Sequence, residues 1–145
     1  MGITMEAIKQ QTGLIRIVII TGSVRPSNYT NMAVALVLDE LKKHPQVSTD
    51  VIDPARLSLP PPGIDPQSKD AKQLRQKVGQ ATGVILATPE YNGSFSSVMK
   101  LVIENLGYPS PLAGKPVALL GIAGGTIGAV KSLEHLRSVA SHVGG

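Results

Sequence analysis

The chain has 145 residues, 42% of them hydrophobic and 17% charged, which suits one domain with its own core rather than two. It contains no cysteine, which excludes disulfides and thiolate metal sites, and no apolar run approaches membrane-spanning length. Its net charge of +4 comes from scattered Lys and Arg, with one Phe and three Tyr available for base stacking, a pattern that disfavours nucleic acid as a partner.

Two segments of unequal length are expected. Residues 1–13 lack the continuous apolar core of a secretory signal and predict a flexible N-terminal tail. Residues 14–145 predict a single domain. The absence of a signal and of cysteine favours the cytoplasm, with no membrane partner.

The first half of the domain alternates strand and helix patterns. The β-branched run 14–20 predicts a buried strand, and 47–52 predicts a shorter one. Between them, residues 31–43 predict an amphipathic helix, because apolar residues recur there at three- and four-residue steps. The proline-rich stretch 53–68 predicts an extended surface connection.

The second half continues this alternation, with a polar helix, two more strands and two more helices. The expected elements are a helix over 70–81, a strand over 83–88, a helix over 96–106, a strand over 116–122, a glycine-rich loop over 123–128 and a helix over 129–143. The helix over 96–106 is apolar on more than one face. That excess predicts a homodimer or homotetramer in which this helix contacts another subunit.

Alternating strands and helices predict an α/β fold, with a parallel sheet covered on both faces. A doubly wound sheet of the flavodoxin type has the strand order 2-1-3-4-5. The chain supplies four of these strands, so we expect the order 2-1-3-4 with the fifth strand and last helix missing. The fourth strand would then form an exposed edge.

The segment after the first strand is rich in groups that bind phosphate. It has only Gly22, so it matches neither the three-glycine dinucleotide fingerprint nor a nucleoside triphosphate loop. Its donors suit one terminal phosphate at the amino end of the next helix. They are Ser23, Arg25, Ser27, Asn28, Tyr29 and Thr30. Alternatively, Ser27, Asn28 and Thr30 only cap that helix.

Two further segments follow strand ends, where open α/β sheets bind ligands. Thr88 to Ser94 reads as a loop in which a proline, an Asn-Gly turn and a tyrosine face a planar ligand. Ala123 to Gly128 reads as a flexible turn. With the first loop, these segments predict a bound mononucleotide.

These three loops resemble those of the NADPH-dependent FMN reductase family, a flavodoxin-like family that includes azoreductases, chromate reductases and quinone reductases. The resemblance rests on Gly22-Ser23-Val24-Arg25, on Pro89 to Ser94, and on Gly121 to Gly128. It implies that the FMN phosphate is held by Ser23, Arg25, Asn28, Tyr29 and Thr30. It also implies that the isoalloxazine is lined by Pro89, Glu90, Tyr91, Asn92 and Gly93, with Ala123, Gly124 and Gly125 at its other edge.

The resemblance further implies the chemistry. Hydride would pass from NADPH or NADH to FMN, and electrons would then pass to a small acceptor such as a quinone, an azo compound, a metal oxyanion or free flavin. No catalytic side chain is required, because backbone amides can stabilise charge on the flavin. The alternative is an FMN-binding electron carrier without NAD(P)H turnover; the basic charge of the chain favours the enzyme.

Several residues also have plain structural interpretations. Glu90 can be a surface carboxylate and Tyr91 a packing residue, and we expect Ser96 and Ser97 to cap a helix. The three histidines are far apart in sequence with no ligand pattern around them. We therefore predict no metal site.

Overall fold

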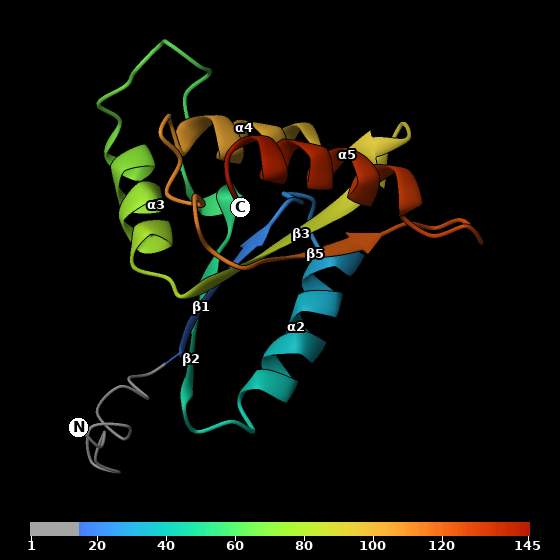
Figure 1. Ribbon diagram of the computed structural model, residues 1–145. Helices are drawn as coiled ribbons and strands as arrows, with labels where there is room; N and C mark the ends of the chain where they lie inside the picture. Colours follow the sequence, from blue (N-terminus) through green and yellow to red (C-terminus); the bar gives the residue numbers. More distant parts are fainter. Residues whose placement is uncertain (1–14) are drawn as a thin grey trace.

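A computed structural model describes residues 15–145 and shows a parallel sheet flanked by helices on both faces (Figure 1). The predicted tail over 1–13 lies outside the described residues. The sheet is built from β1 (Ile15–Thr21), β2 (Val47–Ile52), β3 (Gly83–Tyr91) and β5 (Val117–Ile122). Its order is β2-β1-β3-β5, which confirms the predicted order of the four strands.

The helices divide unequally between the two faces of the sheet. Helix α2 (Tyr29–Leu41) covers one face, where Val34 packs with Ile19 and Ala87. Helices α3 (Lys69–Gly79), α4 (Ser97–Asn105) and α5 (Val130–His142) lie on the other face (Figure 1). The larger core is on that side, where Leu74, Met99 and Leu136 are almost fully buried.

The helices begin where polar side chains satisfy their first amides. Asn28 caps α2 by accepting from the Asn31 amide at 2.8 Å, Ser68 caps α3, and Ser96 caps α4 by accepting from the Met99 amide at 3.0 Å. The expected cap at Ser96 is confirmed, whereas Ser97 is the first helical residue. Because Asn28 is the cap, α2 begins two residues before the predicted helix and includes Tyr29 and Thr30.

Two further expectations were wrong. The strand expected over 83–88 continues to Tyr91 and then pairs antiparallel with β4 (Ser94–Phe95), so Thr88 to Tyr91 is strand rather than loop. The stretch 53–68 is not all surface connection. It contains a short 3-10 helix, Pro54–Arg56, in which Pro54 is buried, and Leu57 and Leu59 pack on the core.

Within residues 15–145, β5 pairs only with β3 and β2 only with β1, so both strands are edges of the sheet. The outer position expected for the fourth strand is confirmed. Over the same residues, none of the helices combines the length and the apolar character needed to span a bilayer.

Candidate functional site

A hollow of about 550 Å³ lies at the carboxyl ends of β1, β3 and β5. It has the size and position of a small-molecule site in an open α/β sheet. The predicted site residues line it, except Asn92, Gly93 and Gly125. Two lining residues were not predicted: Pro26 lies in the first loop, and Ile122 is the last residue of β5. Ser27, one of the first-loop donors expected to suit a phosphate, also lines the hollow.

The first loop is fixed to the sheet through Gly22. The Gly22 amide donates to the carbonyl of Ala87 at 2.6 Å, and the Ser96 hydroxyl donates to the Gly22 carbonyl at 2.6 Å. A side chain at position 22 would place its Cβ 3.0 Å from the Ala87 oxygen and 3.1 Å from Ser96 Oγ. Glycine at this position therefore avoids a tight approach to the backbone of β3.

Ser23 carries the clearest mark of a binding group. The residue is 2% exposed, and its buried Oγ has no hydrogen-bond partner among residues 15–145. An unsatisfied buried hydroxyl is costly, so such a group in a native fold calls for an explanation such as a bound ligand. It lines the hollow beside the amino end of α2, where the first-turn amides have no partner within the helix and favour an anion.

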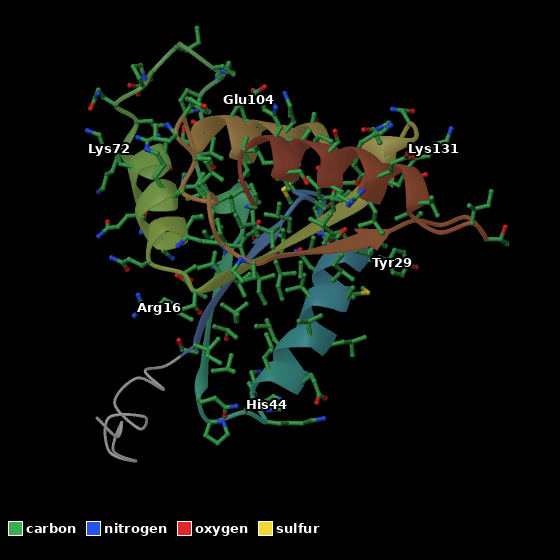
Figure 2. The ribbon with its side chains drawn as sticks, in the orientation of Figure 1. Arg16, Tyr29, His44, Lys72, Glu104 and Lys131 are labelled. Atoms are coloured by element: carbon green, nitrogen blue, oxygen red, sulfur yellow. The ribbon has the colours of Figure 1, made fainter. Side chains whose placement is uncertain are left out.

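The other predicted phosphate residues differ in how far they are buried or already hydrogen-bonded. Asn28 uses both ends of its amide within the loop, because Oδ1 accepts from Asn31 and Nδ2 donates to the Arg25 carbonyl at 2.7 Å. For Asn28 the capping alternative is thus observed. Thr30 is buried in the first turn of α2, while Tyr29 is 76% exposed (Figure 2). Arg25 is also exposed.

The second segment is a hairpin rather than a loop. Asn92 and Gly93 have φ of +52° and +73°, the positive values that a tight two-residue hairpin turn demands, and they connect β3 to β4. Neither residue of this turn lines the hollow. Pro89 is buried and Tyr91 is 38% exposed, and both line the hollow.

Glu90 is neither a free surface carboxylate nor only a pocket wall. Its Oε2 accepts a hydrogen bond from the Ser132 amide at 3.0 Å, in the first turn of α5. The residue at the cap position, Ala129, supplies no side-chain cap. Glu90, which lies on β3, caps the helix instead. Sequence reasoning missed this contact, because its partners are 42 residues apart.

Helix α5 holds the hairpin at two more places. His135 Nδ1 lies 3.0 Å from Ser94 Oγ, so the histidine contacts the strand that follows the turn. The stem of Lys131 passes close to Gly93, where an added Cβ would lie 3.6 Å from Lys131 Cδ (Figure 2). The amino end of α5 and the hairpin therefore form one packed unit.

The third segment closes the hollow next to β5. Ile122, Ala123 and Gly124 line it, and Gly125 does not. Gly121 allows this arrangement because a Cβ there would lie 2.6 Å from the Ala129 Cβ and 2.8 Å from Leu133 Cγ. Its missing side chain lets α5 pack directly on β5.

Taken together, one end of the hollow suits a phosphate and the rest suits a flat ring. Ser23 Oγ and the first turn of α2 form the anion end, whereas Pro89, Tyr91 and Ile122 add apolar and aromatic surface. A hollow that is polar at one end and apolar along the rest matches the shape of flavin mononucleotide, which has a phosphate at one end and a planar ring at the other.

Comparison with known proteins agrees with this geometry. Residues 15–145 match the model of the family described as NADPH-dependent FMN reductase. An FMN-dependent NADPH-azoreductase of Staphylococcus aureus is 30% identical over 128 residues, covering 83% of this chain and 66% of that protein. The chain thus spans slightly less than two thirds of the length of that relative.

Solved structures show the same fold. A flavoenzyme NAD(P)H:(acceptor) oxidoreductase (FerB) from Paracoccus denitrificans superposes with a TM-score of 0.78 and 23% identity, covering 90% of this chain and 73% of that one. An azoreductase from Bacillus anthracis gives 0.73 and 18%, covering 90% and 82%. An apo NADH:FMN oxidoreductase (EMOB) gives 0.75 and 22%, covering 89% and 68%.

Proposed function

This chain belongs to the NADPH-dependent FMN reductase family, and from that premise we propose that it binds FMN in the hollow between β1, β3 and β5 and oxidises NAD(P)H with it. The observation that carries the proposal is the buried Ser23 Oγ at the amino end of α2, which has no partner within the described part of the chain. Bound FMN would supply the redox chemistry, accepting a hydride and passing electrons to a second substrate.

The side chains of this site bind and orient rather than react. Ser23 Oγ donates a hydrogen bond to a phosphate oxygen, and the first-turn amides of α2 add the positive end of the helix dipole. The exposed Arg25 guanidinium supplies a charge-assisted contact to the same phosphate. Tyr91 and Pro89 present flat surface to the ring, and no acid or base side chain is assigned to a step.

We also propose that the electron acceptor is a planar aromatic molecule. The Staphylococcus aureus relative is named an azoreductase, and the wall residues here include two partly exposed tyrosines, Tyr29 and Tyr91. Planar aromatic acceptors such as azo compounds, quinones and free flavins suit such walls, because aromatic faces stack.

A visible spectrum and an FMN titration test the proposal directly. We expect the purified chain to bind FMN, to lose the visible absorption of the oxidised flavin when NADPH is added anaerobically, and to regain it with a quinone or an azo dye. If FMN binds but NADPH does not reduce it, the result would favour an electron carrier over a reductase. No FMN binding would reject the site.

We also propose that copies of the chain associate through α4, as the apolar sequence 96–106 predicts. Support comes from Val98 and Leu101 of α4, which are only partly buried, whereas Met99, Val102 and Ile103 of the same helix are buried in the core of the chain. Light scattering should give a dimer or tetramer at micromolar concentration, and Leu101→Lys should shift it towards the monomer. A monomeric parent chain would refute the association.

A further inference from the structure

A second hollow, of about 500 Å³, lies along the β2 edge of the sheet and shares no lining residue with the first. Its apolar surface comes from Val34 and Leu38 of α2 and from Val51 of β2. Polar groups gather at its end, where β2 gives way to the short helix Pro54–Arg56. Asp53 and Arg56 lie there, and both line the hollow.

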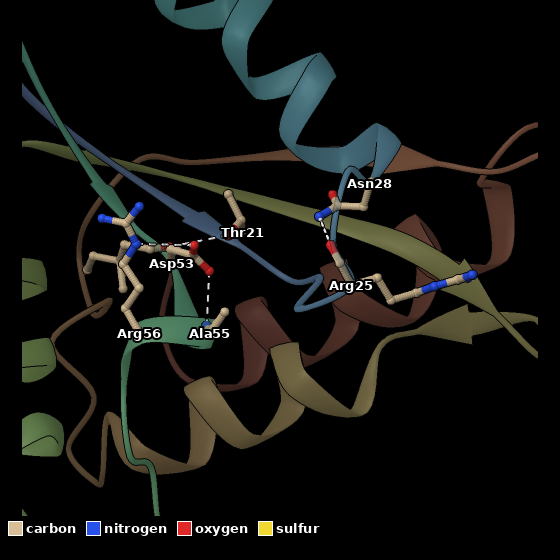
Figure 3. A network of polar contacts seen from close by, with 7 residues as sticks. Thr21, Arg25, Asn28, Asp53, Ala55 and Arg56 are labelled. Carbon is tan, nitrogen blue, oxygen red and sulfur yellow. Dashed lines mark hydrogen bonds and ion pairs between the residues drawn. The ribbon is translucent and has the colours of Figure 1, made fainter.

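The two hollows are separated only by the loop and first turn that lead into α2. Thr21 lines the second hollow and Ser23 the first, while Asn31 lines the second and Thr30 the first. Figure 3 shows Asp53 and Arg56, from the segment after β2, near Thr21 at the end of β1, and Arg25 and Asn28 in the loop after β1, at the amino end of α2. A ligand held at the second hollow therefore lies beside the phosphate end of the first.

Arg56 is the cation available to such a ligand. Its side chain is 86% exposed, and its contact with Asp53 is loose, with Nε 3.8 Å from Oδ2. Asp53 is more engaged: its side chain is 28% exposed, and Oδ1 accepts from the Ala55 amide at 2.9 Å. The other cation of the hollow, Lys77, is already paired with Asp50 at 3.0 Å.

We propose that this second hollow receives the adenosine end of the reductant, with Arg56 contacting the 2′-phosphate of NADPH. A purine suits the apolar surface of Val34, Leu38 and Val51, and a guanidinium suits a phosphate. In dinucleotide-binding sheets of the Rossmann type, whose glycine fingerprint this chain lacks, an acidic or an arginine side chain near the end of the second strand selects between a ribose hydroxyl and a 2′-phosphate. Asp53 and Arg56 stand at that place in this fold.

The spacing of the strands makes the reach feasible. Neighbouring strands lie about 4.8 Å apart, so three spacings separate β2 from β5 by about 14 Å. An extended dinucleotide can bridge that distance, with its adenosine beside β2 and its nicotinamide over the hollow next to β3 and β5. The inference rests on the proposed FMN site, because the nicotinamide must meet the flavin.

Binding of 2′,5′-ADP, an adenosine fragment with the 2′-phosphate but no nicotinamide, tests the second hollow without any turnover. We expect calorimetry to detect its binding to the FMN-loaded chain. Arg56→Ala should weaken it about 10- to 100-fold, and Arg56→Lys should restore part of the loss. Arg137→Ala, at an exposed arginine of α5 outside the hollow, should leave it unchanged. Binding of 5′-AMP should not respond to Arg56→Ala.

A second variant blocks the hollow without touching a charge. Ala35 is an exposed α2 residue that lines it, and Ala35→Leu keeps a good helix former while reducing the space. It should weaken both fragments, and in turnover it should raise KM for NADPH and leave kcat unchanged. The proposal is overturned if 2′,5′-ADP does not bind, or binds Arg56→Ala and Ala35→Leu as it binds the parent chain. If NADPH still bleaches bound FMN in that case, the reductase proposal stands and the reductant docks elsewhere.

Discussion

The Glu90 carboxylate accepts a hydrogen bond from the backbone amide of Ser132 at 3.0 Å, and this contact joins the end of β3 to the first turn of α5. Two walls of the first hollow meet through it, since Glu90 lines the hollow and α5 follows the loop that contains Ala123 and Gly124. Glu90 is thus a positioning residue for the wall of the hollow that Ala123 and Gly124 form.

Removing the Glu90 acceptor should loosen α5 and widen the hollow. We expect Glu90→Ala to lower the free energy of unfolding by about 1 kcal/mol, the usual cost of losing a helix cap, and to weaken FMN binding. Glu90→Gln keeps an acceptor oxygen and should lose much less in both. Urea unfolding and FMN titration measure the two effects. Equal losses in Gln and Ala would show that charge, not the acceptor oxygen, holds α5.

Ser23→Ala should change stability and binding in opposite directions. Without FMN, the variant no longer buries an unsatisfied hydroxyl, so its free energy of unfolding should rise by about 1 kcal/mol. With FMN, the lost hydrogen bond should raise the dissociation constant. Urea unfolding with and without FMN tests both signs. A fall in the stability of the FMN-free variant would mean that Ser23 Oγ has a partner within the fold.

Arg25→Ala should weaken FMN binding by about 1.5 to 3 kcal/mol, because a charge-assisted contact to the phosphate is lost. The side chain is exposed, so the free energy of unfolding without FMN should hardly change. Riboflavin, which lacks the phosphate, should bind the parent and the variant alike. If Arg25→Ala lost as much affinity for riboflavin as for FMN, Arg25 would contact the ring rather than the phosphate.

Gly121→Ala should destabilise the fold by about 1 to 3 kcal/mol, because its Cβ would meet Ala129 and Leu133 at less than van der Waals distance. Gly124→Ala is the matched control in the following loop, where a Cβ meets nothing within 4 Å. Thermal unfolding compares the two. Similar melting temperatures would mean that α5 can move away from β5 at little cost.

The sequence predicts much of this fold because its patterns are local. The apolar repeat of α2 and the β-branched run of β1 depend on neighbours in the chain, and both elements lie close to their predicted positions. The boundary of α2 was missed by two residues because a cap, Asn28, decides it. The end of β3 was missed because its last residues, Glu90 and Tyr91, are ordered by pairing with β4.

The site was predictable in its loops and not in its supports. Ser23 and Arg25 stand out in sequence as candidate phosphate ligands, and both line the hollow, while their role there stays a prediction. The contact between Glu90 and Ser132 joins distant segments, and nothing about a glutamate or a serine in the sequence predicts it. The second hollow has no motif either. It arises where α2, β2 and the short helix after β2 meet, which only the assembled fold reveals.

The double tie of Gly22, to the Ala87 carbonyl and the Ser96 hydroxyl, has a consequence for the entropy of binding. The loop that would cradle a phosphate is already held in place by contacts with β3 and α4, so a ligand has little chain left to order. Affinity then depends on the contacts made rather than on a folding penalty. Association should therefore proceed in one phase, at a rate set by diffusion and charge rather than by rearrangement of the loop.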